Sequence, residues 1–397
     1  MHNVITDYIL RAKQARPTGF YSPAYKIGEL LSFELAKNPH FYFFSPDETT
    51  SNRFEQVFEI EKRAWALPKE EWDLPESKNG RIIEMLSENV LFSVMTGHLM
   101  NGEPAMMGSY EAFFTVAASQ IIQQIKFIKQ CKETSWRKPI PAVNLLSTST
   151  CWRQDHNGFT HQSPALISTL LSIPSNLVNC FFPIDDVAAE EVFNFMIQSD
   201  NVVNFTTFNK HDEPRYLSRT MSESQKQNHG ALIFNEYNPA DPDFVMVGVG
   251  DLMSKEVIEA IEILKQDIPE VKIRFVNVNA LSYRAIGTTE DKLTKVEFAN
   301  FFTTDKPIIA NFHGYPETLT NIFEKYTHRG RVRVHGFLEE GSTTTPFEML
   351  RRNGASRYDL AIDVAALTGH LDLVRKYQAK LAENHAHAVE FGEDLVS

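Results

Sequence analysis

Apolar runs rich in β-branched residues alternate with segments of helical periodicity along most of the chain, and this alternation restricts the fold more than any other feature. Runs typical of buried strands occupy residues 40–44, 142–146, 177–182, 202–208, 244–249, 272–278, 307–312 and 331–337. Helical patterns lie between them, at residues 25–36, 80–98, 110–129, 187–198, 255–265, 318–326, 357–368 and 370–381. The repeated strand-then-helix order predicts an α/β protein with mostly parallel sheets.

One polar segment, residues 217–229, interrupts this order. It is rich in Ser, Gln and Lys and has no periodicity, which is typical of a linker. We therefore expect a first domain over residues 1–216 and a second over residues 230–397. A chain of 397 residues is long enough for two domains of ordinary size.

Composition excludes several classes of protein. The formal net charge is −12, whereas general binding of nucleic acid requires a basic surface. Cys131, Cys151 and Cys180 have no C-x-x-C spacing, so we expect a reducing compartment and neither a disulfide framework nor a metal site. His385 and His387 form an H-x-H pair in a predicted helical tail, and two exposed histidines without a role explain this pair better than a metal site does. The start has no signal-peptide pattern and the apolar runs are too short to cross a bilayer, so we expect a cytoplasmic protein without a membrane partner.

The densest group of chemically active residues is Trp-Arg-Gln-Asp-His-Asn-Gly-Phe-Thr-His-Gln, at residues 152–162. It follows a predicted strand and precedes a predicted helix, and loops at the carboxyl ends of strands are where α/β sheets bind ligands. His156 and His161 can donate or accept protons near neutral pH. The alternative explanation is a hydrogen-bonded loop whose histidines are purely structural.

This segment resembles the phosphoketolases, thiamine diphosphate enzymes related to transketolase, which carry Q-D-H-N-G-F-x-H-Q at this point. Further matches follow the order of the family, at residues 45–53, 86–88, 109–113, 136–139, 313–316, 340–347 and 356–358. The resemblance covers nearly the whole chain. It implies two transketolase-like three-layer α/β/α domains with mostly parallel sheets, namely a pyrimidine-binding domain followed by a transketolase-like C-terminal domain.

A phosphoketolase subunit extends well beyond the matching region, which is its carboxyl-terminal half. In the family the amino-terminal half binds the diphosphate of the cofactor through Mg²⁺. In enzymes of the superfamily this half carries the motif Gly-Asp-Gly. This sequence lacks Gly-Asp-Gly, and its nearest fragment, Gly250 and Asp251, is better explained as a helix N-cap. The resemblance therefore implies a separate diphosphate-binding chain that holds Mg²⁺ and shares thiamine diphosphate. We expect a homodimer for this chain alone and a heterotetramer with the partner.

The resemblance assigns four residues to the cofactor. Glu88 matches the carboxylic acid that hydrogen-bonds the aminopyrimidine ring and favours its reactive tautomer, a task suited to an acid in a water-poor pocket. Tyr110 matches an aromatic residue beside the ring, Phe113 is a second candidate for stacking, and Glu48 lies in the matching segment 45–53. From the residues alone, Glu88 could equally lie on the surface of an amphipathic helix, and Phe113 could belong to the core.

Three further residues are assigned to the chemistry of the substrate by the same resemblance. Asn157 and His161 match polar residues near the substrate. His156 is specific to the phosphoketolase form of the motif.

Phosphate contacts are the last group that the resemblance implies. Ser51 and Lys210 match residues that contact phosphate in the family, and Gln154 is assigned with them. Lys132 stands where the family commonly carries Arg, and Lys keeps the charge but loses the bidentate geometry. Glu317, which follows His-Gly-Tyr-Pro, is an acidic departure from the family pattern.

The implied activity is cleavage of a ketose phosphate, such as xylulose 5-phosphate or fructose 6-phosphate, with inorganic phosphate to acetyl phosphate and an aldose phosphate. This chain would act only together with the diphosphate-binding chain. Two alternatives stay open: a split transketolase-like protein that transfers a two-carbon unit, and a non-catalytic half that binds and regulates a partner chain. The Q-D-H-N-G-F form and the Thr-rich run at residues 342–345 favour the phosphoketolase.

Overall fold

The computed structural model describes residues 20–73 and 76–395 and divides into two compact units. Unit 1 comprises Met1–Ser149 and Asp185–Arg219, and unit 2 comprises Thr150–Ile184 and Thr220–Ser397. Most of the segment expected to be a linker forms a helix, α7 (Arg219–Gln227). The domain boundary inferred from the sequence stays a prediction.

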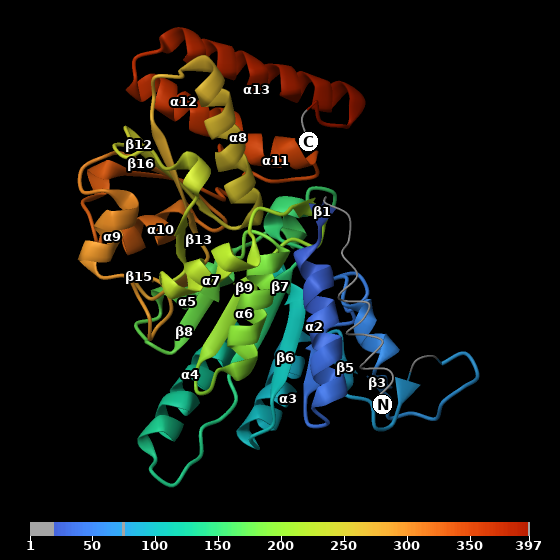
Figure 1. The fold of residues 1–397 in the computed structure, drawn as a ribbon. Coiled ribbons are helices and arrows are strands. Elements are labelled where there is room, and N and C mark those ends of the chain that lie inside the picture. The colour runs from blue at the N-terminus through green and yellow to red at the C-terminus, as the bar shows by residue number, and fades with distance from the viewer. Residues whose placement is uncertain (1–19, 74–75, 396–397) are drawn as a thin grey trace. The chain divides into compact units, whose positions relative to one another are not determined.

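A parallel sheet is the framework of unit 1 (Figure 1). Its strands are β2 (Tyr42–Ser45), β3 (Arg63–Ala64), β4 (Glu76–Ser77), β5 (Ile82–Glu84), β6 (Ala105–Tyr110), β7 (Val143–Thr148) and β9 (Val203–Thr207). They lie in the order β9–β7–β6–β2–β5–β3–β4, and the ladders between them are parallel. The central strands β7 and β9 are buried along their whole length, as expected for parallel strands whose two faces are both covered.

Helices and short turns connect the strands of unit 1. They are α2 (Pro23–Lys37), η1 (Glu55–Glu59), α3 (Glu88–Met100), η2 (Glu111–Ala117), α4 (Ala118–Glu133) and α6 (Asp186–Gln198), with a short antiparallel pair of β1 (Phe20–Tyr21) and β10 (Glu213–Pro214). Side-chain caps define two of the starts, because Ser22 accepts from Tyr25 N before α2 and Asp185 accepts from Ala188 N before α6.

Unit 2 contains a second sheet of mostly parallel strands. Its strands are β11 (Ala231–Ile233), β12 (Phe244–Val249), β13 (Ile273–Val278), β16 (Ile308–Phe312) and β17 (Val332–His335). The order is β11–β13–β12–β16–β17, with β11 antiparallel to its neighbour and the other pairs parallel. A separate ladder joins β14 (Ala280–Ser282) antiparallel to β8 (Val178–Phe181) and to β15 (Ala285–Ile286).

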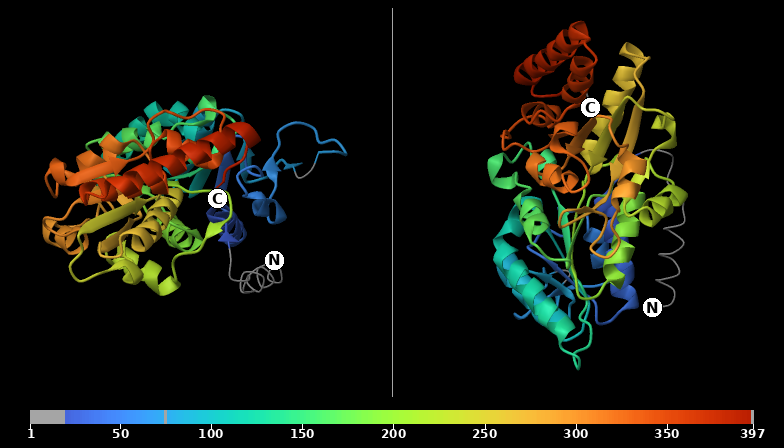
Figure 2. Two further views of the ribbon diagram at one scale, coloured as in Figure 1. Left: turned by 90° about the horizontal axis from the view of Figure 1, so that it is seen from above. Right: turned by 90° about the vertical axis from the view of Figure 1, so that its left-hand side faces the viewer.

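The helices of unit 2 cover both faces of this sheet. They are α5 (Ala165–Ser172), α8 (Asp251–Asp267), α9 (Lys295–Phe302), α10 (Pro316–Phe323), α11 (Pro346–Arg352), α12 (Arg357–Leu367) and α13 (Leu371–Phe391), with short turns η3 (Cys151–Arg153), η4 (Phe159–His161), η5 (Asn235–Tyr237) and η6 (Arg329–Arg331). The crossover from β12 to β13 and that from β16 to β17 run in opposite directions along the sheet. Because such crossovers are right-handed, α8 and α10 lie on opposite faces. Helix α12 packs on α8 and the long helix α13 packs on α12 (Figure 2).

The predicted α/β class with mostly parallel strands is confirmed, and each strand predicted from an apolar run is present. The single helix predicted over residues 80–98 is wrong. Ile82 and Ile83 instead pair with Phe43 and Phe44 of β2, and helix α3 begins only at Glu88. Across the described parts of the chain, no helix is both long enough and apolar enough to cross a membrane.

His335, at the end of β17, is held between two acceptors of hydrogen bonds. Its Nδ1 atom lies 2.6 Å from the carbonyl oxygen of Gly354, and its Nε2 atom lies 2.8 Å from Oδ2 of Asp363. A carbonyl and a carboxylate both accept, so this geometry requires a proton on each ring nitrogen. Burial alone would lower the pKa of His335, but the hydrogen bond and charge of Asp363 outweigh it and raise the pKa above 6.5.

Replacing His335 by Gln therefore changes how stability depends on pH. The native state binds this proton more tightly than the unfolded chain does, so the stabilisation is complete below about pH 6.5 and is lost as the pH rises through the raised native pKa. We expect the difference in unfolding free energy between wild type and H335Q to decrease as the pH rises through the native pKa of His335. Urea unfolding at several pH values measures it, with the exposed His328→Gln as the matched control. A difference that is constant with pH would contradict the protonated assignment.

Candidate active site

The carboxyl ends of the parallel strands in unit 1 bring together residues that are distant in the sequence. Glu48 and Ser51 follow β2, and Tyr110 ends β6. Glu48 Oε2 accepts a hydrogen bond from Tyr110 N at 2.9 Å, and the Tyr110 hydroxyl donates to Ser51 Oγ at 3.1 Å. Ser51 Oγ in turn donates to the carbonyl oxygen of Glu48 at 3.2 Å. Three predicted site residues thus form one hydrogen-bonded group.

An aromatic pair and a cation adjoin this group. The rings of Tyr110 and Phe113 stack with centroids 6.0 Å apart and planes inclined by 7°. Lys210 follows β9, and its Nζ atom lies 5.1 Å from the centroid of the Tyr110 ring, within reach of a cation–π interaction. The backbone of Lys210 is fixed because its carbonyl oxygen accepts from Ser22 Oγ at 2.8 Å. The strand ends therefore place Glu48, Ser51, Tyr110, Phe113 and Lys210 together, and we call these five residues the unit 1 cluster.

Glu48, the carboxyl of the unit 1 cluster, is half-buried. Its burial raises its pKa to about 7, against the lowering effect of the hydrogen bond from Tyr110 N, and the negative charge of Glu88 raises it further. Glu88 itself is the first residue of α3 and is half-buried. The raised pKa of Glu48 was not predicted, because its environment includes residues distant in the sequence, such as Tyr110.

Lys132 does not lie with the unit 1 cluster. It is exposed in the last turn of α4, whereas the aromatic pair precedes the first turn of that helix. At ~1.5 Å per residue, the helix separates the two ends by about 20 Å. The structure of this unit therefore gives Lys132 no contact with the predicted phosphate ligands Ser51 and Lys210.

In unit 2 the segment predicted as an active-site loop begins inside the core. Cys151 and Trp152 are buried in a cluster with Met253, Phe337 and Met349. The Trp152 indole N–H donates to the carbonyl oxygen of His313 at 2.8 Å. The loop is therefore anchored at one end before its polar residues begin.

Two buried glutamines organise the rest of this loop. Gln162 Nε2 donates to the carbonyl oxygens of Gln154 at 2.8 Å and of Ser342 at 3.0 Å. Asn157 Nδ2 donates to Gln154 Oε1 at 2.5 Å. The Nε2 group of Gln154 is buried and has no hydrogen-bond partner among the described residues, which is uncommon for a buried donor. Gly158 has φ +71°, and a Cβ atom there would lie 3.2 Å from Thr343 Oγ1, which favours glycine at this turn.

The two histidines of the loop differ in exposure. His156 is exposed, and its Nε2 atom lies 3.3 Å from Asn157 Nδ2, which can donate to it. His161 is half-buried, with Nδ1 2.8 Å from Thr160 Oγ1. Both rings are therefore placed to exchange protons with a bound molecule or with solvent.

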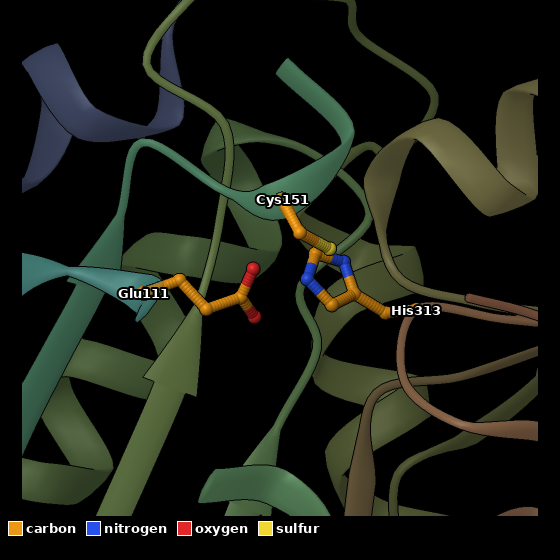
Figure 3. A group of neighbouring side chains, drawn as sticks. All are labelled: Glu111, Cys151 and His313. Carbon is orange, nitrogen blue, oxygen red and sulfur yellow. The ribbon is translucent and has the colours of Figure 1, made fainter. Parts of the chain in front are cut away.

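A buried pair of residues in unit 2 was not assigned a role from the sequence. Cys151 Sγ and a ring nitrogen of His313 lie within 4.8 Å of each other, and Figure 3 shows the two side chains pointing toward each other. His313 belongs to the His-Gly-Tyr-Pro match, and this match is the sequence signal that could have pointed to the pair.

The histidines of the H-x-H pair, His385 and His387, lie on helix α13, where His385 Nδ1 is 3.0 Å from Glu348 Oε1.

The unit 1 cluster suits a flat heteroaromatic ring with hydrogen-bonding nitrogens. A stacked aromatic pair offers a face for such a ring, and a carboxyl with a pKa near 7 can either donate or accept a hydrogen bond at its edge. The ammonium of Lys210 and the hydroxyl of Ser51 suit an anionic group.

Two family models match the chain. Residues 26–199 match the model described as D-xylulose 5-phosphate/D-fructose 6-phosphate phosphoketolase, and residues 210–397 match the C-terminal domain of the same family. A probable phosphoketolase of Pseudomonas putida is 33% identical over 393 residues, which are 97% of this chain and 49% of that protein. A probable phosphoketolase of Rhodopseudomonas palustris is 33% identical over 365 residues, which are 90% of this chain and 47% of that protein. The chain thus spans about half the length of the curated relatives it matches.

Solved transketolases share the fold. A transketolase from Pichia stipitis in complex with fructose 6-phosphate superposes with a TM-score of 0.68 at 15% identity, covering 88% of this chain and 46% of that one. A protein described as a split gene transketolase, inactive beta4 tetramer, gives a TM-score of 0.58 at 14% identity, covering 89% of this chain and 99% of that one. The expected transketolase-like α/β fold with mostly parallel sheets is therefore confirmed.

The raised pKa of Glu48 gives a test that needs only this chain. Carbon-13 NMR of the side-chain carboxyls, assigned with E48Q, is expected to show Glu48 titrating near pH 7 instead of near 4.5. Glu88→Gln removes a neighbouring negative charge, so we expect the midpoint of Glu48 to fall, whereas the exposed Glu59→Gln leaves it unchanged. A titration midpoint near 4.5, or one that does not change in Glu88→Gln, would show that Glu48 does not occupy this environment.

Proposed function

The chain belongs to the phosphoketolase family, and we propose that it is one chain of a split, thiamine diphosphate-dependent phosphoketolase. The assembled enzyme would cleave a ketose phosphate with inorganic phosphate to acetyl phosphate and an aldose phosphate. A separate diphosphate-binding chain would hold Mg²⁺ and share the cofactor. None of the three cysteines forms a disulfide in the described structure, which suits such an enzyme in the reducing cytoplasm.

The observation that carries this proposal is the unit 1 cluster. Tyr110 and Phe113 would stack on the aminopyrimidine ring, and Glu88 would share a proton with its ring nitrogen. Thiamine diphosphate, when bound, supplies a nucleophilic carbon that forms when this proton is shared. Glu48, which holds a proton near neutral pH and is coupled to Glu88 by charge, would keep a second proton close to the ring.

Cationic and hydroxyl side chains at the carboxyl ends of the unit 1 strands would bind phosphate groups. Lys210 and Ser51 adjoin Tyr110, so a phosphate beside the stacked rings would contact both. Lys132 has no such position in unit 1, and its assignment to phosphate stays a prediction that depends on the assembled enzyme.

In unit 2 the loop residues would handle the polar part of the substrate. The unpartnered Gln154 Nε2 would donate a hydrogen bond to a substrate oxygen, and Asn157 would be held in place by Gln154 Oε1. The exposed His156 and the half-buried His161 would exchange protons with substrate hydroxyls.

An exposed apolar stripe supports the partner chain. Helix α3 buries Leu91, Met95 and Leu99, yet Val90 and Val94 on another face are 42% and 47% exposed. Leu86, which precedes the helix, is 83% exposed. Apolar side chains grouped in this way beside Glu88 are typical of a surface that another chain covers.

Two alternatives stay open. The likeness to a split gene transketolase, whose tetramer is described as inactive, favours a half that acts only with a partner, but it is equally consistent with a split transketolase-like transferase. The match to the phosphoketolase models favours phosphate as the acceptor. A non-catalytic half that binds and regulates a partner would need none of the arranged donors described above.

The test is turnover by the assembled complex. The chain is co-purified with a diphosphate-binding chain of the family and assayed for acetyl phosphate from fructose 6-phosphate or xylulose 5-phosphate and phosphate. We expect acetyl phosphate from wild type, and a loss of roughly 10²–10⁴-fold in Glu88→Gln, because an amide cannot share the proton as an acid does. Glu59→Gln, an exposed residue of η1, is the matched control and should retain activity.

Each other outcome selects an alternative. Two-carbon transfer to an aldose phosphate without acetyl phosphate would favour the transketolase-like protein. A stable complex without either reaction would favour the non-catalytic half. Full activity of Glu88→Gln would show that Glu88 is not the activating acid.

A further inference from the structure

The last turns of helix α4 and the loop after it form a basic region of unit 1 (Figure 1). Residues 118–139 contain five cationic residues and one acid, although the whole chain has a net charge of −12. Four of the five are exposed lysines that make no ion pair with a described residue: Lys126, Lys129, Lys132 and Lys138. A helix end favours cations only in its last turn, which contains Lys132, and lysines three residues apart repel one another. Helix stability therefore does not explain the other three.

An exposed tryptophan is held in place beside these lysines. Trp136 is 79% exposed, and its turn is closed by a hydrogen bond from Arg137 N to Thr134 O at 3.0 Å. Arg137 Nη2 donates to Met100 O at 3.1 Å, which ties the turn to the end of α3. Phe127 of α4 is 49% exposed. Large apolar side chains exposed together are typical of an interaction surface, so we call the four lysines, Phe127 and Trp136 the basic surface.

A second segment of unit 1 has the opposite charge. Residues 65–73 leave the sheet after β3, project from its edge (Figure 1) and contain three acids and one lysine. Trp72 in this segment is 78% exposed. Glu70 N donates to Asp73 Oδ2 at 2.7 Å and Asp73 N donates to Glu70 O at 3.1 Å, so Trp72 also lies in a closed turn. The carboxylates of Glu70 and Glu71 form no ion pair within the described chain. We call residues 65–73 the acidic arm.

The sheet keeps the acidic arm and the basic surface of one chain apart. Helix α4 leads into β7, whereas the arm leaves from β3, and the strands β6, β2 and β5 lie between β7 and β3. At about 4.8 Å per neighbouring strand, β7 and β3 are about 19 Å apart, and the arm projects away from this gap. A second copy of the chain therefore offers what each surface lacks, namely the opposite charge and a second exposed tryptophan.

We propose that the basic surface binds the acidic arm of a second copy of this chain. In a two-fold dimer this contact occurs twice, because each copy contributes one arm and one surface. Glu70 and Glu71 pair with the lysines, and Trp72 packs beside Trp136, where a lysine ammonium can lie over its ring. The contact uses none of the residues in the apolar stripe of α3, and it does not rest on the proposed function.

Analytical ultracentrifugation of the purified chain at several salt concentrations tests the contact. We expect a dimer whose dissociation constant rises between about 0.05 M and about 0.5 M NaCl, because salt screens exposed charges. A dimer joined instead by the apolar stripe of α3 would not weaken with salt, since burial of apolar area is not screened.

Paired charge reversals identify the two surfaces. Lys129→Glu with Lys138→Glu, and separately Glu70→Lys with Glu71→Lys, should each raise the dissociation constant about 10- to 100-fold, because like charges then face each other. Mixing the two variants should restore dimers. In the mixed dimer the reversed arm of one variant meets the reversed surface of the other, and the second contact is that of the wild type.

The matched control reverses Lys272 and Lys295, two exposed lysines of unit 2, and should leave the dissociation constant unchanged. A monomer at every salt concentration, or a dimer that persists unchanged in both reversed variants, would overturn the proposal. Failure of the mixed variants to form dimers would also overturn it. No measurement here uses cofactor or substrate, so a failure of the phosphoketolase proposal would leave the result valid.

Discussion

The hydrogen bond from Tyr110 N to Glu48 joins the ends of two neighbouring parallel strands, and the arrangement of the unit 1 cluster depends on it. It fixes the loop after β2 against the end of β6, which sets where the stacked rings lie. Asn52 holds the same loop to the end of β7, since its Oδ1 atom accepts from Thr148 at 3.3 Å and Ser149 at 3.0 Å. The chemistry proposed for unit 1 therefore relies on the register of three adjacent strands.

Unit 2 supports its loop in a different way, through contacts between residues far apart in the chain. Trp152 anchors the start of the loop to the backbone of His313, and Gln162 ties its end to Ser342. His156 and Asn157, which are assigned to the substrate, are left exposed between these two anchors. Rigid support beneath exposed acid–base groups is what a loop needs if it is to hold catalytic geometry.

Much of this could be predicted from the sequence, because strand runs and motif residues are local signals. The apolar runs located the parallel strands, and the Q-D-H-N-G-F segment located the loop of unit 2. The start of α3 could not be read from the pattern, because Ile82 and Ile83 suit a helix or a strand equally until β2 pairs with them. The pKa of Glu48 depends on residues distant in the sequence, such as Tyr110, and the separation of the acidic arm from the basic surface depends on the order of the strands. Such effects arise only from tertiary structure.

The central claim is that this chain carries the pyrimidine side of a shared cofactor site and lacks the diphosphate side. Calorimetric titration of thiamine diphosphate with Mg²⁺, into the chain alone and into its complex with a diphosphate-binding chain, tests it most directly. We predict weak or absent binding to the chain alone and tight binding to the complex. Tight, Mg²⁺-dependent binding to the chain alone would contradict the claim.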